Sequence, residues 1–165
     1  MVVVSGGSSG IGFATAAHFL ASGDKVAFYG ENAARVDAAC EMLASRFGTG
    51  PVIGKVVDQR DRAALEDFFM HVSRTWGAPD VLVCNAGISP KGPDGARIPF
   101  ARISPEAWQD VLTTNLTAAA WACQFVLPAM ALKGCGRIVL VGSVASRALP
   151  RIAGGAYTVS KAGLS

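Results

Sequence analysis

Short apolar runs alternate with segments of helical length along the whole chain, and this alternation constrains the fold more than any other feature. The runs are rich in Val and Ile at consecutive positions, which is typical of parallel strands covered on both faces. Strands are expected at 2–4, 25–29, 52–57, 81–84 and 137–141. Helices are expected near 11–22, 33–47, 61–76 and 104–133, with a further helix from Gly155 onward.

Strand–helix alternation of this kind predicts an α/β fold, a doubly wound (Rossmann-like) parallel sheet with right-handed crossovers and helices on both faces. The chain has 165 residues, 51% of them hydrophobic and 16% charged, which is enough for one domain with a buried core. We therefore expect residues 1–165 to form a single α/β domain. In such sheets ligands bind beyond the carboxyl ends of the strands, where the strand order reverses.

The same composition argues against several classes of protein. So much apolar surface excludes intrinsic disorder. The most apolar stretch, 116–132, is interrupted by Thr117, Gln124 and Pro128, so no membrane span is expected. The net charge of +3 is spread out, without a Lys/Arg cluster, so nucleic acid is not an expected partner.

Cysteine usage points to a reducing compartment. None of the four cysteines has a spacing to another Cys, or to either His, that is typical of metal ligands. We therefore predict no metal site, free thiols and a cytoplasmic location.

A glycine-rich turn joins the first expected strand to the first expected helix, with the sequence Ser5-Gly6-Gly7-Ser8-Ser9-Gly10-Ile11-Gly12. Residues without a Cβ allow the backbone to approach a pyrophosphate, and the helix N-terminus supplies unpaired N–H groups and a favourable dipole. A plain strand–helix turn is the alternative, because glycine-rich turns are common. The position between strand and helix favours dinucleotide binding.

Five motifs in this order resemble the short-chain dehydrogenase/reductase family. The first is the glycine turn, and the second is Asn85-Ala86-Gly87, with Cys84 where the family's motif has another Asn. Three more follow as Asn115 in an expected helix, Ser143 after the fifth strand, and the pair Tyr157 and Lys161 in a Tyr-x-x-x-Lys pattern. The resemblance covers nearly the whole chain and implies a dinucleotide-binding domain.

Tyr157 and Lys161 are four residues apart, so a helix places both on one face. A neighbouring ammonium favours the phenolate and lowers the pKa of the phenol, which is otherwise near ~10. The resemblance implies that Tyr157 exchanges the proton of the substrate oxygen, and that Lys161 lowers its pKa and binds the nicotinamide ribose. It also implies that Ser143 binds the substrate oxygen and that Asn115 helps to hold a water in a proton relay. Taken singly, each of these residues also has an ordinary structural role.

The resemblance further implies NAD or NADP as the cofactor. The residues it assigns to cofactor binding are Gly6, Ser8, Ser9, Gly10, Ile11, Gly12, Glu31, Asp58, Asn85, Ala86, Gly87, Tyr157 and Lys161. Gly30 stands where an NAD-type acid usually falls, and Glu31 where an NADP-type Arg often falls. A carboxylate there would repel a 2′-phosphate, so NAD is predicted over NADP. By resemblance, Asp58 contacts the adenine.

The expected substrate is a small or medium alcohol/ketone pair, although Arg147 and Arg151 leave an acidic substrate open. The resemblance implies a homo-oligomer, a dimer or a tetramer. An alternative of another class is a catalytically silent nucleotide-sensing or scaffold protein that keeps the fold. Retention of Ser143, Tyr157 and Lys161 together argues against it.

The resemblance stops at Ser165, inside the helix that carries Tyr157 and Lys161, whereas family members continue with further strands. We therefore expect the domain to be incomplete at its C-terminus. Such a chain is predicted to be a cofactor-binding half-site with weak or absent turnover, and its fifth strand is predicted to be an open sheet edge.

Overall fold

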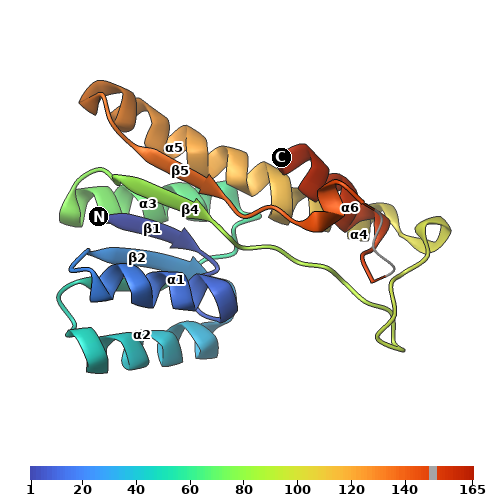
Figure 1. Ribbon diagram of the computed structural model, residues 1–165, viewed down its shortest axis with the longest axis horizontal. Coiled ribbons are helices and arrows are strands. Elements are labelled where there is room, and N and C mark those ends of the chain that lie inside the picture. The colour runs from blue at the N-terminus through green and yellow to red at the C-terminus, as the bar shows by residue number, and fades with distance from the viewer. Residues whose placement is uncertain (149–151) are drawn as a thin grey trace.

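A sheet of five parallel strands forms the centre of the computed structural model, which describes residues 1–148 and 152–165 (Figure 1). The strands are β1 (Val2–Ser5), β2 (Val26–Gly30), β3 (Val52–Val56), β4 (Val81–Cys84) and β5 (Arg137–Leu140). Their order is β3-β2-β1-β4-β5, and each neighbouring pair is parallel. The order therefore reverses between β1 and β4, as the doubly wound prediction requires.

The principal helices begin and end within a few residues of the expected positions. They are α1 (Gly10–Ala21), α2 (Ala33–Phe47), α3 (Arg62–Trp76), α4 (Pro105–Leu112), α5 (Ala118–Lys133) and α6 (Gly155–Leu164). The side chains of Asn32, Asp61 and Ser104 each accept a hydrogen bond from first-turn N–H groups of α2, α3 and α4. These caps satisfy N–H groups that have no partner within the helix. Two short 3₁₀ turns, η1 (Phe100–Arg102) and η3 (Val144–Ser146), were not predicted.

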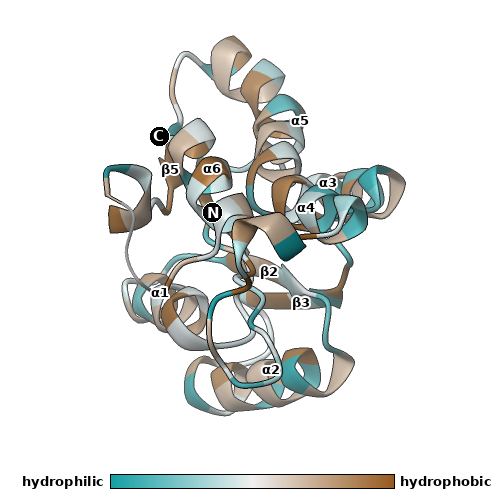
Figure 2. Ribbon diagram, turned by 90° about the vertical axis from the view of Figure 1, so that its right-hand side faces the viewer, coloured by the Kyte–Doolittle hydropathy of each residue, from teal (hydrophilic) through white to brown (hydrophobic). Residues whose placement is uncertain are grey.

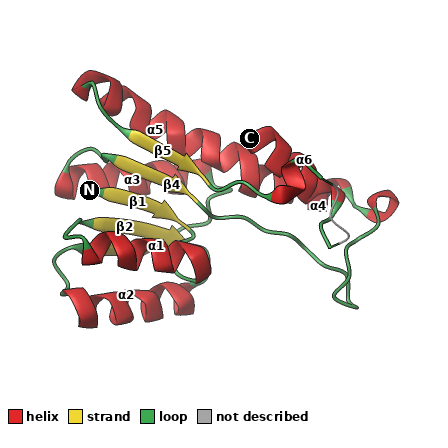
Figure 3. Cartoon of the chain, viewed as in Figure 1, coloured by secondary structure: helices red, strands yellow, loops and turns green. Residues whose placement is uncertain are grey.

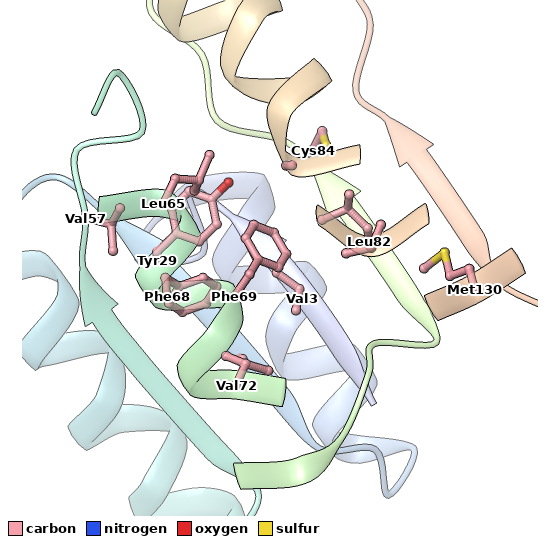
Figure 4. Packing of buried hydrophobic residues seen from close by; sticks show 13 residues of the cluster. Val3, Tyr29, Val57, Leu65, Phe68, Phe69, Val72, Leu82, Cys84 and Met130 are labelled. Carbon is pink, nitrogen blue, oxygen red and sulfur yellow. The ribbon is translucent and has the colours of Figure 1, made fainter. Parts of the chain in front are cut away.

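Two helical layers cover opposite faces of the sheet, with α1 and α2 on one side and α3 and α5 on the other (Figure 2). Successive residues of one strand point to different layers, so that Val2 and Val4 pack with α1 and α2, whereas Val3 packs with α3 and α5. Figure 4 shows the second cluster, in which Phe68 and Phe69 lie against Tyr29 of β2. Strands buried on both faces need apolar residues at consecutive positions, which is the pattern seen in the sequence.

The two edge strands depart from the expectation that every strand is covered on both faces. In β3 Val56 is 51% exposed, and in β5 Val139 and Leu140 are 48% and 41% exposed. Both are edge strands, and β3 packs mainly against α2, so parts of these strands lack cover. Among the described residues, β5 pairs only with β4.

The expected helix at 104–133 is helical throughout but not uniform. Between α4 and α5 it contains one π-helical turn, η2 (Thr113–Thr117). The stretch Pro105–Lys133 is long and apolar enough to cross a membrane by length and composition, a test that core helices also pass. In this fold Ala118, Ala122, Val126 and Met130 are buried, the last three in the cluster under the sheet. Sheet packing therefore accounts for this buried stripe, whereas Leu127 and Leu132 on the same helix are exposed.

The connection from β4 to α4 is a long loop that leads away from the strands (Figure 3). At its far end, α4 packs against α6, and α6 also packs against η2 and η3. The helix that carries Tyr157 and Lys161 is thereby held beside the carboxyl ends of β4 and β5, close to the point where the strand order reverses.

Candidate active site

A cavity of about 340 Å³ lies at the carboxyl ends of β1, β2 and β4. Its lining residues come from the glycine turn, from the ends of β2, β3 and β4, and from η2. They are Gly6, Ser8, Ser9, Gly10, Ile11, Tyr29, Gly30, Glu31, Asn32, Arg35, Val57, Asp58, Gln59, Asn85, Ala86, Gly87, Ile88 and Thr114. The structure thus brings to one cavity Glu31, Asp58 and, except for Gly12, the predicted cofactor residues of the glycine turn and of the Asn85-Ala86-Gly87 motif. Gly12, Tyr157 and Lys161 lie outside this lining.

Two glycines set the shape of the turn that forms the cavity floor. Gly6 has a φ of 64°, a conformation that side chains with a Cβ rarely adopt. Gly12 lies beneath the turn, where an added Cβ would be 2.2 Å from the Gly6 carbonyl oxygen and 2.6 Å from Asn85 Nδ2. Ser9 precedes α1 without capping it through its side chain, and Ser9, Gly10 and Ile11 line the cavity. The turn therefore has the close backbone and open helix N-terminus that a pyrophosphate needs.

Ser5 and Asn85 join the glycine turn to the end of β4. The backbone N–H groups of Asn85 and Ala86 both donate to Ser5 Oγ, at 2.9 Å each. In return, Asn85 Nδ2 donates to the Ser5 carbonyl oxygen at 3.1 Å and to that of Gly6 at 3.4 Å. These bonds tie the end of β1 to the first residues after β4, next to the cavity.

Asn115 lies in the π-helical turn, and the residue is 1% exposed. Its Oδ1 accepts from the Ile88 N–H at 2.7 Å, and its Nδ2 donates to the Ile88 carbonyl oxygen at 2.9 Å. The same Nδ2 donates to Ser160 Oγ at 3.0 Å, and Ser160 donates to the Tyr157 carbonyl oxygen at 2.8 Å. The amide therefore ties the loop after β4 to α6. Its predicted share in a water-mediated proton relay stays a prediction.

Lys161 and Tyr157 lie on α6, one turn apart. Lys161 is 4% exposed, its Nζ donates to the Val141 carbonyl oxygen at 2.7 Å, and burial lowers the pKa of its ammonium. A Cβ added to Gly87 would lie 3.3 Å from Asn115 Oδ1 and 3.5 Å from Lys161 Nζ. Gly87 lines the cavity, so its backbone separates the cavity from the side chains of Asn115 and Lys161.

Ser143 and Tyr157 lie on two segments that pack against each other. Ser143 precedes η3, which packs against α6, and its Oγ accepts from the Ala145 N–H at 3.1 Å. The Ser143 hydroxyl can still donate its own proton. Tyr157 is half-buried and borders a small, mainly apolar pocket. The pocket is lined by Ser89, Pro90, Ile98, Ile103, Ala107, Val111, Gly154, Ala156 and Tyr157.

The wall of the cavity near β2 and β3 carries a cluster of charges. Arg60 Nε and Nη2 bind the Asp58 carboxylate at 3.0 and 2.8 Å, and this contact holds the pKa of Asp58 below its usual value. Arg60 also lies 3.5 Å from an Asp110 oxygen and 4.0 Å from a Glu31 oxygen. The guanidinium therefore joins the ends of β2 and β3 to α4.

Sequence reasoning missed several residues that build the site. Gln59 is buried and its Nε2 donates to the Thr114 carbonyl oxygen at 2.7 Å, which links the cavity wall to the π-helical turn. Ser160 and Arg60 were also missed. The available signal for Gln59 was a polar residue directly after Asp58 at the end of an apolar strand, whereas the Ser160 contact depends on tertiary packing.

No group of His, Cys, Asp and Glu suited to a metal ion occurs in the described part of the chain. Arg147, named above for an acidic substrate, is exposed beyond η3. Arg151 lies outside the described residues. Arg147 does not line the cavity.

Comparisons with known proteins show the family of the chain. The family model described as short chain dehydrogenase matches residues 1–165. A 3alpha-hydroxysteroid dehydrogenase of Mediterraneibacter gnavus is 32% identical over 88% of this chain and 56% of its own length. An NADP-dependent 3-hydroxy acid dehydrogenase of Salmonella typhi is 31% identical over 98% of this chain and 61% of its own.

Among solved structures, a 3-oxoacyl-[acyl-carrier protein] reductase with bound NAD from Brucella melitensis superposes with a TM-score of 0.90. It is 30% identical, and the match covers 99% of this chain and 60% of that one. The chain thus spans only part of the length of the relatives it matches.

Proposed function

Because the chain belongs to the short chain dehydrogenase family, we propose that it is an oxidoreductase of alcohol and ketone substrates that uses NAD or NADP. The observation that carries the proposal is the cavity at the strand-order reversal, whose Gly87 wall adjoins the buried Lys161. The glycine turn, the uncapped start of α1 and a volume of about 340 Å³ fit a dinucleotide. When bound, the nicotinamide supplies hydride chemistry.

The chain's own residues would handle one proton and orient the substrate. Tyr157 donates that proton to the substrate oxygen during reduction and accepts it during oxidation. Lys161, one turn further along the same face of α6, would bind the ribose of the nicotinamide when the cofactor is present. Ser143 donates its hydroxyl proton to the substrate oxygen, since its Oγ already accepts from Ala145. The apolar pocket beside Tyr157 receives the carbon part of the substrate.

Asn115 acts differently from a residue that contacts substrate. Its amide holds Ile88 and Ser160, and through Ser160 it fixes the turn of α6 that begins at Tyr157. We expect it to keep Lys161 and Tyr157 at a constant distance from the cavity. A water relay beside Asn115 would be a second role.

NAD is the preferred cofactor in this proposal. Glu31 lines the cavity at the end of β2, where an acidic side chain binds the 2′-hydroxyl of the adenosine ribose and repels a 2′-phosphate. Fluorescence titration with NADH and NADPH tests this preference. Tighter binding of NADPH would contradict it.

The enzymatic part is tested with Tyr157→Phe. NADH binding is measured by fluorescence, and NADH oxidation is followed with a panel of ketones. The expected result is unchanged binding and loss of whatever turnover the wild-type chain shows. Thr158→Val is the matched control, because Thr158 lies on the same helix and its buried Oγ1 lacks a partner among the described residues.

Two outcomes decide between the proposal and its alternative. Equal NADH oxidation by the wild type and Tyr157→Phe would refute the role of Tyr157. Tight NADH binding with no turnover on any ketone would instead support a silent nucleotide-sensing or scaffold protein. Within the proposal we also expect a cytoplasmic protein, because its four cysteines are free thiols. We expect a homo-oligomer as well, and light scattering tests this.

A further inference from the structure

Gln59 reaches from the wall of the cofactor cavity to the helical segment that carries Asn115. The residue follows Asp58 on the connection between β3 and α3, lines the cavity and is 8% exposed. Its Nε2 donates to the Thr114 carbonyl oxygen at 2.7 Å. A polar side chain this well buried is costly unless it is hydrogen-bonded. The contact therefore determines where the Gln59 amide lies, and it joins the end of β3 to η2.

The acceptor of this bond has lost its usual partner within the helix. In an α-helix the Ala118 N–H would donate to the carbonyl oxygen four residues before it, which is that of Thr114. In η2 the Ala118 N–H donates instead to the Thr113 carbonyl oxygen. Gln59 thus supplies a donor to the oxygen that the π-helical turn leaves free. Without this donor the α-helical arrangement is favoured, because it pairs the Thr114 oxygen within the helix.

The position of Asn115 depends on the same turn. A change of one residue in the helix register rotates a side chain by roughly 100° about the helix axis. Asn115 holds both backbone groups of Ile88 and donates to Ser160 Oγ, and Ser160 donates to the Tyr157 carbonyl oxygen. A rotation of that size breaks the contacts of Asn115. Gln59, Asn115 and α6 are therefore coupled through one turn of helix.

We propose that Gln59 is a positioning residue, whose bond to the Thr114 carbonyl oxygen stabilises the π-helical turn and so holds Asn115 and α6 beside the cofactor cavity. The consequence for the reaction rests on the proposed function, in which α6 acts at the nicotinamide half of the cofactor. Gln59 itself stands next to Asp58, which is predicted to contact the adenine. Its loss should therefore weaken binding of the nicotinamide half, a result that direct contact between Gln59 and the adenosine does not produce.

Hydrogen exchange tests the positioning without any nucleotide. Gln59→Met keeps an unbranched side chain of similar length and removes the donor. Because the Ile88 N–H donates to Asn115 Oδ1, its exchange reports whether Asn115 stays in place. We expect this N–H to exchange about tenfold faster in Gln59→Met, relative to the amides of β1, which report the stability of the core. Gln109→Met is the matched control and should leave Ile88 exchange unchanged, because Gln109 Nε2 donates to Thr113 Oγ1 at the exposed surface of the same turn.

Nucleotide binding tests the consequence for the reaction. NADH and AMP are titrated into the 165-residue chain by calorimetry, since AMP carries the adenosine half of the cofactor alone. Gln59→Met should weaken NADH binding by about fivefold or more and change AMP binding by less than about twofold. In an Asn115→Ala background the further effect of Gln59→Met on NADH binding should disappear, because the side chain that Gln59 positions is gone.

Faster exchange of the Ile88 N–H together with a selective loss of NADH binding supports the inference. Unchanged Ile88 exchange, an equal change in Gln109→Met, or an equal loss of NADH and AMP binding overturns it. If Gln59→Met does not fold, Gln59→Asn, whose amide is one methylene group shorter, is measured in its place with the same expected changes. If the wild type binds neither nucleotide, the proposed function fails, whereas the exchange experiment alone still decides whether Gln59 positions Asn115.

Discussion

Removing the Asn115 side chain is the strongest single perturbation that the site offers. Asn115→Ala deletes three hydrogen bonds at a position that is 1% exposed. Each such bond contributes about 0.5–1.5 kcal/mol net, and the buried groups of Ile88 lose partners that water cannot replace. We therefore expect the free energy of unfolding to fall by about 2–4 kcal/mol.

The assay is urea unfolding followed by circular dichroism, with the midpoint and slope fitted together. In a thermal melt the same loss lowers Tm by about 2–4 °C per kcal/mol for a chain of this size. Asn32→Ala is the control, because Asn32 makes one exposed hydrogen bond, to Arg35 N, at the start of α2, and its loss costs about 1 kcal/mol. If the two variants lose the same stability, the reasoning about the buried amide is wrong.

Three further changes test other parts of the structure. Gly12→Ala places a Cβ against the Gly6 carbonyl oxygen, so it should cost about 1–3 kcal/mol and weaken NADH binding in a fluorescence titration, whereas Gly50→Ala, with open space around it, should change neither. Burial raises the pKa of Cys84 to about 12, so iodoacetamide followed by mass spectrometry should label the exposed Cys135 first and Cys84 only after unfolding. Burial also lowers the pKa of Lys161 from 10.5, so its charged form destabilises the fold at neutral pH, and this effect fades as the pH rises. In urea unfolding, the free energy of unfolding of the wild type relative to Lys161→Met should therefore rise toward pH 10.5. A difference that does not change with pH would contradict this.

The sequence predicted the strands and most of the helices well because apolar runs and capping residues are local signals. The expected start at Asp61 shows this, since that residue is the cap and the helix begins one residue later. The exposure of Val139 was not predictable from its own strand, because a strand's cover depends on where the helices lie.

The candidate site was predictable where a motif carries it and not where packing does. The glycine turn and Asn85 reached one cavity as expected. The bond from Gln59 to Thr114 and the Asn115–Ser160 contact join segments 55 and 45 residues apart. No local pattern encodes such pairs, and the π-helical turn that exposes the Thr114 carbonyl oxygen is a rare conformation that periodicity alone does not indicate.

The position of β1 between β2 and β4 bears on how the chain folds. Val2 pairs with Val26 on one side and with Val81 on the other. The first pairing closes a short loop, whereas the second closes a much longer one, and we expect it to form later because non-local contacts cost more loop-closure entropy. Ser5 meets Asn85 only at that late step. The cofactor cavity therefore exists only in the fully assembled sheet, and NADH fluorescence during refolding would report the last step rather than the first.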